Sequence, residues 1–191
     1  MVQLDKIYTR AGDGGRTRLA TGEEVPKWSP RVEAYGAVDE TNSAVGVARL
    51  HALGEPALDA LLARIQNELF DLGADLATPE RDKPLPFEAL RIQTGQVTRL
   101  EADIDALNAD LGPLTSFILP AGAPLCAHLH MARAISRRAE RTIAELMATP
   151  NERVSAEALK YANRLSDFLF VAARWANRGN GDVLWIPGGS R

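Results

Sequence analysis

Apolar residues recur every three or four positions over most of this chain of 191 residues. The clearest run follows Pro56 and stops before Thr78-Pro79, and its apolar positions are Leu58, Leu62, Ile65, Leu69, Leu72 and Leu76. This spacing places the six side chains on one face of an α-helix, whereas a half-buried strand would alternate apolar and polar residues. The chain is therefore expected to bury helical faces against one another.

Helix-boundary signals surround four further segments. Ser29-Pro30 suits an N-cap with proline at the first helical position, and Thr149, Pro150 and Glu152 form a capping-box pattern. The helices predicted around these signals run from about 31 to 51, 90 to 112, 124 to 146 and 152 to 177. Five long helices, short connections and no convincing strand predict an all-α fold, namely a five-helix antiparallel bundle of ferritin-like up-down architecture.

One domain is expected over residues 1–191, because a chain of this length buries about 70% of its unfolded surface in a single core. Residues 1–30 are rich in glycine and proline and have no apolar period, so they are interpreted as an extended arm. Residues 31–178 form the predicted bundle, and residues 179–191 a loop-like C-terminal tail.

The charge balance excludes several classes of partner. Lys and Arg number 22 against 25 Asp and Glu, so no overall positive field attracts nucleic acid or anionic lipid. The single cysteine, Cys126, rules out an internal disulfide framework. Charges near the N-terminus argue against a secretion signal, and glycine, proline and histidine interrupt the uncharged stretch 111–132. A cytoplasmic protein with neither a membrane nor a nucleic-acid partner is expected.

Common catalytic motifs are missing from the sequence. It contains no GxxxxGK[ST] phosphate loop, no GxGxxG fingerprint, no GxSxG elbow and no HExxH zinc motif. A ferritin-like di-iron centre needs Glu-x-x-His on two helices, and no histidine here has Glu three residues before it. His128 and His130 are two residues apart on a predicted helix, so they do not share a face. No metal site built from protein side chains alone is predicted.

The N-terminal arm carries the residue types that hold polyphosphates. Glycines let backbone N–H groups approach an anion, threonine hydroxyls bind phosphate oxygens or Mg²⁺, and arginines supply positive charge. The segment consists of Thr9, Arg10, Ala11, Gly12, Asp13, Gly14, Gly15, Arg16, Thr17 and Arg18. The composition alone is equally typical of a flexible terminal loop with a turn at residues 12–14.

A row of arginines is predicted on one face of the fourth helix. Arg133, Arg137 and Arg141 are spaced four residues apart, with Arg138 and Glu140 beside them. Three cations in a row repel one another unless an anion or carboxylates lie opposite. The pattern therefore indicates either an anion site or a solvated helix flank.

Polar residues also interrupt two of the apolar helices. They are Asp39, Glu40 and Asn42 in the first helix, and Asn163, Arg164 and Asp167 in the fifth. Polar groups near a bundle interior must be paired or must bind a ligand. Both a ligand site and a structural network are consistent with these positions.

Five strings in these regions resemble the PduO-type ATP:cob(I)alamin adenosyltransferases. They are TRAGDGGRT in the arm, RVEAYGAVDETNS at 31–43, FILPAG at 117–122, HMARAISRRAER at 130–141 and NRLSDFLF at 163–170. They stand in the family's order and span nearly the whole chain. Two positions depart from the family, which often has lysine where Gly14 stands and glycine where Ala121 stands; Arg16 is a candidate substitute for the lysine.

The resemblance implies a homotrimer that holds ATP between the arm of one chain and the helices of its neighbour. Thr9 to Arg18 would wrap the triphosphate, with Mg²⁺ entering alongside ATP and Thr17 as its candidate protein contact. The remaining ATP-binding residues implied are Lys27, Arg137, Arg138, Ala139, Glu140, Arg141 and Asn163. Asp39 would pair with Arg133 across the subunit boundary, and Phe117 would stand beside the corrin.

The implied reaction suits a chain without a catalytic histidine. Cob(I)alamin attacks the 5′ carbon of ATP, a cobalt–carbon bond forms, and triphosphate leaves, so the protein supplies alignment and charge stabilisation rather than a base. Phe117 would occupy the lower axial position of cobalt and so favour reduction. A reductase and an adenosylcobalamin-dependent mutase are candidate partners. The rival interpretations are a nucleic-acid-binding bundle and a non-catalytic interaction bundle.

Overall fold

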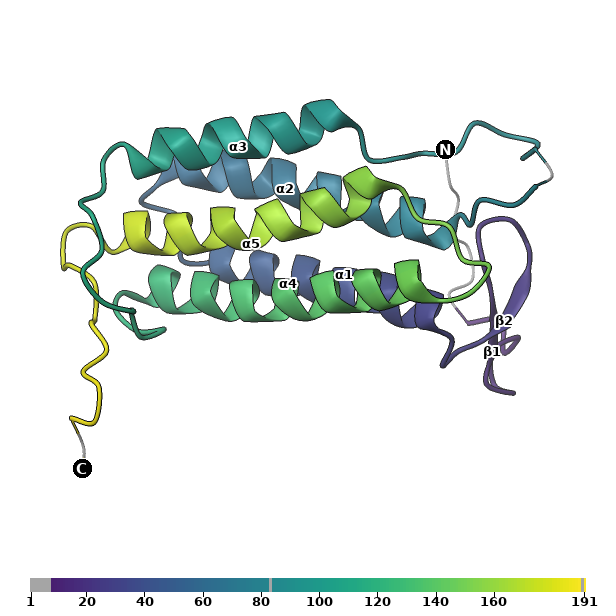
Figure 1. Ribbon diagram of the computed structural model, residues 1–191, viewed down its shortest axis with the longest axis horizontal. Helices are drawn as coiled ribbons and strands as arrows, with labels where there is room; N and C mark the ends of the chain where they lie inside the picture. The colour runs from purple at the N-terminus through teal and green to yellow at the C-terminus, as the bar shows by residue number, and fades with distance from the viewer. Residues whose placement is uncertain (1–7, 83, 190) are drawn as a thin grey trace.

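Five helices dominate the computed structural model, which describes residues 8–82, 84–189 and 191. They are α1 (Pro30–Arg49), α2 (Pro56–Ala77), α3 (Thr94–Asn108), α4 (Pro124–Ala148) and α5 (Ala156–Ala176). Successive helices alternate in direction, and α1 and α5 both pack against α4 (Figure 1). The predicted all-α up-down bundle is confirmed, with one refinement: α3 packs mainly on α5, and these two helices run the same way (Figure 1).

The apolar stripe predicted for α2 faces the core. All six of its leucine and isoleucine side chains are at most 2% exposed. They pack with α5 side chains that include the fully buried Tyr161 and Phe168. At about 1.5 to 3 kcal/mol for each buried apolar side chain, this packing is what holds the helices together.

Two helix starts differ from the sequence prediction. α3 begins at Thr94, later than expected, because Gln93 and Gln96 form a reciprocal capping box. α5 begins at Ala156, where the Ser155 hydroxyl accepts a hydrogen bond from the backbone of Ala158. The pattern at 149–152 is not the cap of α5, since Glu152 instead forms an ion pair with the buried Arg31 at the start of α1.

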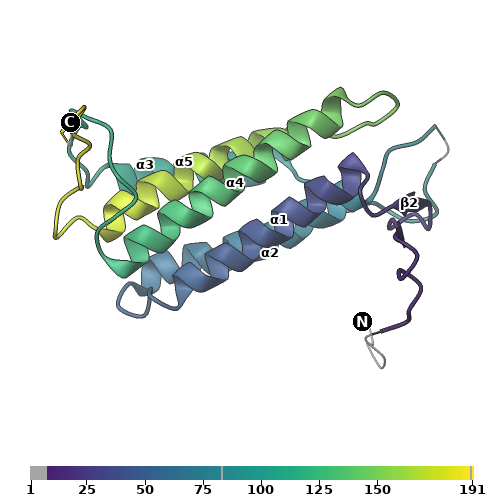
Figure 2. The same cartoon turned by 90° about the horizontal axis from the view of Figure 1, so that it is seen from below.

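The arm is more structured than expected. Two short antiparallel strands, β1 (Arg16–Arg18) and β2 (Glu24–Pro26), form a hairpin, so the prediction of no strand is wrong in this segment. Leu19 is buried, and the backbone of Ala20 donates a hydrogen bond to the Ala77 carbonyl at the end of α2. Residues 1–7 of the predicted arm lie outside the described residues. The hairpin is thereby attached to the end of the bundle where α1 begins (Figures 1 and 2).

The opposite end of the bundle holds the segment before α4 and the C-terminal tail (Figure 1). Ile118 and Leu184 form an antiparallel β-bridge there, so the tail is not simply a loop. Among the helices that the structure describes, none is long and apolar enough to cross a membrane.

Candidate active site

One face of α4 carries buried polar atoms that have no hydrogen-bond partner. In the described part of the chain, five buried side-chain atoms lack a hydrogen-bond partner, and three of them belong to α4. These three are His130 Nδ1, Arg133 Nε and Glu140 Oε2. The spacings 130–133 and 133–140 keep the three residues on one helix face. Buried polar groups are normally hydrogen-bonded, so this face is the first candidate for ligand binding.

A cavity of about 700 Å³ opens beside this face. His130 and Arg133 from α4, Phe170 from α5 and the segment 114–118 line it. Phe117 is 78% exposed at this cavity, and its ring meets that of Trp185 edge-on at 6.0 Å between centroids. An aromatic side chain that is so exposed adds little to the core, which favours the ligand-facing role predicted for Phe117.

Electrostatics at the cavity favour a positively charged site beside a neutral imidazole. Burial lowers the pKa of His130, and the positive charge of Arg133 lowers it further, against a smaller opposite effect of Asp182. The ring is therefore uncharged at neutral pH. Burial, followed by the charge of Arg137, lowers the pKa of Arg133, but a guanidinium remains protonated in proteins. The cavity thus presents one cation and one neutral donor and acceptor.

Further along α4, the predicted ATP residues form a second polar group. Asn163 of α5 donates a hydrogen bond to Glu140 at 2.7 Å. Arg137 lies 3.5 Å from Glu140 and 3.4 Å from the Ser166 hydroxyl. Arg141 donates to the backbone carbonyl of Arg137. The structure thus brings four of the predicted ATP residues together, while the buried Ala139 faces the core.

Arg138 belongs to neither group. Its guanidinium forms an ion pair with Glu40 of α1. The arginine row itself is divided, because Arg137 has a carboxylate partner in Glu140, whereas Arg133 has none in the described chain.

The arm forms a separate cavity of about 470 Å³. Its lining consists of Thr9, Ala11, Gly12, Gly14, Arg16, Thr17, Arg18 and Glu24. The Lys27 ammonium lies so close to Gly12 that a Cβ at that position would be 2.9 Å from Nζ. Lys27 thus faces the glycine turn of the arm.

Backbone conformation explains part of the glycine content of the arm. Gly15 has φ +76°, a left-handed conformation that L side chains rarely adopt, and Arg10 shares it with φ +62°.

Arg16 pairs with Glu24 at 2.5 Å, so it is not a free substitute for the missing lysine. The pKa of Tyr35 on α1 is raised by burial, and its hydrogen bond with Thr17 opposes that shift.

Within one chain, the structure does not bring the arm and Phe117 together. They lie at opposite ends of the bundle, and the α4 helix between them, 25 residues in length, is about 37 Å long.

Asp39 is exposed on α1 and lines another cavity with Phe70, and no ion pair among the described residues includes it. The predicted Asp39–Arg133 pair is therefore not formed inside the chain.

Several of the polar residues singled out in the helices have structural partners. Asn42 is buried and exchanges hydrogen bonds with the backbone and side chain of Gln66. Arg164 pairs with Asp167 and with Glu101 of α3. The structural interpretation therefore holds for these three positions.

Sequence reasoning did not predict two residues at the site. His130 was considered only as half of a metal pair with His128, although it stands three residues before Arg133 on the same helix face. Trp185 lies in the tail, where no periodicity marks it. Among the described residues, no group of three His, Cys, Asp or Glu side chains could hold a metal ion.

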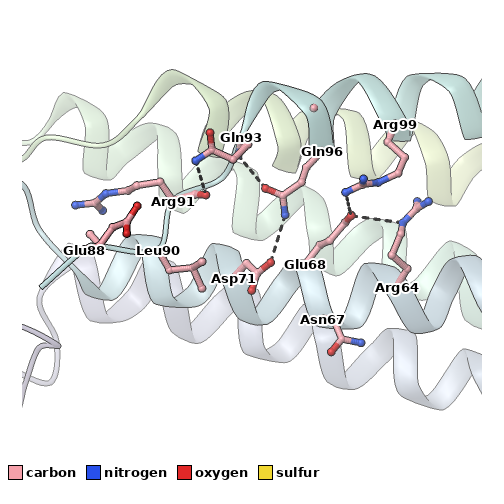
Figure 3. A pocket seen from close by; sticks show the side chains of 12 residues that line it. Arg64, Asn67, Glu68, Asp71, Glu88, Leu90, Arg91, Gln93, Gln96 and Arg99 are labelled. Atoms are coloured by element: carbon pink, nitrogen blue, oxygen red, sulfur yellow. Dashed lines mark hydrogen bonds and ion pairs between the residues drawn. The ribbon is translucent and has the colours of Figure 1, made fainter.

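A further cavity, of about 750 Å³, lies between α2, α3 and residues 88–93. Arg64 and Arg99 both point at the buried carboxylate of Glu68 (Figure 3). Glu68 also accepts a hydrogen bond from the Tyr161 hydroxyl. Because the Glu68 carboxylate already has three partners, it is not available to a ligand. The cavity is therefore interpreted as a gap between polar helix faces.

Comparison with known proteins agrees with this geometry. The family description "Cobalamin adenosyltransferase" matches residues 7–176. A corrinoid adenosyltransferase from Mycobacterium leprae is 49% identical over 193 residues, covering 98% of this chain and 99% of the relative. One from Bacillus subtilis is 44% identical over 185 residues, covering 93% of this chain and 91% of the relative.

Solved structures give the same result. A variant of the PduO-type ATP:corrinoid adenosyltransferase from Lactobacillus reuteri, complexed with cobalamin and ATP, has a TM-score of 0.85 at 42% identity, covering 94% of this chain and 96% of that one. Another variant of that enzyme, complexed with ATP, has a TM-score of 0.81 at 41% identity, covering 94% of this chain and 100% of that one. From the family match over residues 7–176 and these close relatives, the chain belongs to the cobalamin adenosyltransferase family.

Proposed function

We propose that this chain transfers the 5′-deoxyadenosyl group of ATP to cob(I)alamin, forming adenosylcobalamin and releasing triphosphate. The observation that carries the proposal is the exposed Phe117 at a cavity that also holds the unpaired Arg133. The family match and the arm cavity support it.

The chemistry requires alignment and charge stabilisation. The electron pair of cob(I)alamin forms the cobalt–carbon bond while the bond from the 5′ carbon to oxygen breaks, so negative charge develops on the triphosphate. Backbone N–H groups of residues 9–18, the Lys27 ammonium and the Arg137 guanidinium stabilise that charge. Mg²⁺ enters with ATP, and Thr17 is its candidate protein contact.

Phe117 acts on the other substrate. Its ring occupies the space below the corrin and excludes the lower axial ligand of cobalt. A four-coordinate Co(II) is more easily reduced than a ligated one, so the ring favours formation of the Co(I) nucleophile. The electron comes from a reductase, and the product serves an adenosylcobalamin-dependent mutase. A cytoplasmic location suits both partners.

A homotrimer brings the two halves of the site together. The arm hairpin and the segment before α4, which carries Phe117, lie at opposite ends of the bundle (Figure 1). A neighbouring copy is therefore the natural source of the arm. Asp39 and the unpaired Arg133 have opposite charges and then meet across the boundary. This arrangement accounts for two charged groups that lack an ion pair in the described chain.

The direct test is spectroscopic. Purified protein, reduced cobalamin and Mg-ATP should convert the cobalamin spectrum to that of the adenosylated form, with one triphosphate released per product. Omission of ATP is the control. An unchanged spectrum with fully reduced cobalamin would refute the proposed function.

Arg137→Ala and Asn163→Ala should each raise the KM for ATP by about 10-fold, since a hydrogen bond to a charged group is worth about 1.5 kcal/mol or more. The KM for cobalamin and the helical content should stay near wild type, because neither side chain packs in the core. Arg164→Ala removes two surface ion pairs, with Glu101 and Asp167, and serves as the matched control. A normal KM for ATP in both variants would exclude them from the site.

Gly14→Lys should lower the KM for ATP by about 3-fold, because an exposed charge pair contributes about 0.5 to 1 kcal/mol. A Cβ at Gly14 meets nothing within 4 Å, so a side chain can begin at this position without a steric clash. Gly14→Gln adds similar length without charge and is the control. Equal effects of the two variants, measured by steady-state kinetics, would show that charge is not the cause.

A further inference from the structure

The segment that carries Phe117 is paired with the C-terminal tail through its backbone. The Leu119 N–H donates to the Val183 carbonyl at 2.7 Å, and the Trp185 N–H donates to the Phe117 carbonyl at 2.8 Å. The Ser116 hydroxyl donates to the Trp185 carbonyl at 2.9 Å. The two segments therefore share one short antiparallel ladder, with the rings of Phe117 and Trp185 in contact.

Asn177, at the end of α5, joins the two segments. Its side chain is 1% exposed, and its two amide atoms bind different partners. The Oδ1 atom accepts a hydrogen bond from the Ala123 N–H at 3.0 Å, and the Nδ2 atom donates to the Gly181 carbonyl at 2.5 Å. A weaker contact at 3.4 Å comes from the Asn180 side chain. One amide thus binds Ala123, which directly precedes α4, and Gly181 in the C-terminal tail.

Gly122 shows how closely the loop approaches this amide. Its φ is +112°, and a Cβ there would lie 2.6 to 2.8 Å from the amide atoms of Asn177. Such a distance is far below contact for carbon, so the backbone at this position rests directly on the Asn177 side chain. The loop and the amide are therefore fitted to each other.

We propose that Asn177 is a positioning residue for cobalamin, acting through the loop that carries Phe117 and through the tail that carries Trp185. This inference rests on the proposed function. Asparagine supplies an acceptor and a donor from one short side chain, and this site uses both. Because the amide fixes both segments to the end of α5, its loss lets Phe117 shift relative to the corrin, while the ATP residues on α4 and the arm keep their places.

Two variants separate the two hydrogen bonds. Asn177→Asp keeps the acceptor for Ala123 but places an oxygen against the Gly181 carbonyl, so it should release the tail while holding the loop. Asn177→Ala removes both hydrogen bonds. Asn180→Ala, three residues away and exposed, loses only the weak contact and is the matched control.

The expected result is a split between the two substrates. Asn177→Ala should raise the KM for cobalamin by about 10-fold, because a small misplacement of a positioning group is costly, and should reduce the four-coordinate Co(II) signal in electron paramagnetic resonance. The KM for ATP should stay within about 2-fold of wild type. Hydrogen exchange should rise in peptides covering 116–123 and 181–186 in Asn177→Ala, and only in the latter in Asn177→Asp.

Some outcomes would overturn the inference. Equal changes in the KM for ATP and the KM for cobalamin in Asn177→Ala would contradict the positioning role. So would a full four-coordinate Co(II) signal in that variant. Asn177 would then have only a structural role at the end of α5. If Asn177→Ala does not fold, unchanged exchange and cobalamin KM in the isosteric Asn177→Asp would refute it. If the proposed function itself is wrong, the wild-type protein will form no adenosylcobalamin at all. That outcome differs from the results above, which compare variants with an active wild type.

Discussion

Phe117→Ala should reduce adenosylation from Co(II) cobalamin by about 100-fold, the scale of loss that misalignment at a reacting centre produces. Its stability should remain near wild type, because the ring is 78% exposed and its removal opens no core cavity. The loss should shrink when chemically prepared Co(I) is supplied, since the ring acts before reduction by excluding the lower ligand. ATP affinity should not change.

Phe168→Ala is the matched control for this prediction. Phe168 is fully buried, so its loss should cost about 3 to 5 kcal/mol of folding free energy and lower the melting temperature strongly. The measurements are calorimetric melting, steady-state kinetics from Co(II) and Co(I), and electron paramagnetic resonance of the four-coordinate species. A Phe117→Ala protein that keeps the four-coordinate signal would show that the axial role is wrong.

Arg133→Ala should dissociate the trimer and abolish turnover at micromolar protein concentration. Removing one partner of a buried ion pair costs about 3 to 5 kcal/mol, because the remaining charge stays desolvated. In the proposed trimer, the substitution would leave the Asp39 carboxylate desolvated and without its partner at each subunit boundary. Arg133 also lines the Phe117 cavity, so the same substitution removes a cation from the site.

Analytical ultracentrifugation tests the assembly, and a charge exchange tests the pairing. Arg133→Asp alone should be monomeric, whereas Arg133→Asp combined with Asp39→Arg should recover part of the trimer, since the opposite charges meet again. A wild-type protein that sediments as a monomer contradicts the trimer. An intact trimer with normal turnover in Arg133→Ala would disprove the pairing with Asp39.

The helices were predictable because their packing is periodic. The α2 stripe from Leu58 to Leu76 repeats over about five turns, and such a long regular pattern has no competing interpretation. Helix starts were less predictable because several residues compete for the capping role. Glu152 looked like part of a cap for α5, but Arg31 is buried and needs a carboxylate, so Glu152 serves the ion pair instead.

The hairpin and the tail could not be predicted from periodicity. Each arm strand has three residues, too few to show an alternation, and the only buried apolar side chain beside them is the single Leu19 among the described residues of the hairpin. Likewise, the bridge between Ile118 and Leu184 joins segments that are remote in sequence. The motifs that carry the family resemblance predicted the candidate residues. The division of these residues into two groups along α4 could be seen only in the fold.

The buried atoms of His130, Arg133 and Glu140 that have no hydrogen-bond partner within the chain also limit how stable a single chain can be. A buried polar group without a partner costs about 1 to 3 kcal/mol, so an apolar replacement of His130, which has no ion-pair role in the proposed trimer, should raise the melting temperature while it removes activity. Selection for thermostability alone would therefore favour inactive variants first. Conversely, substrates that satisfy these atoms bind the folded state only, and saturating substrate should shift the melting temperature upward.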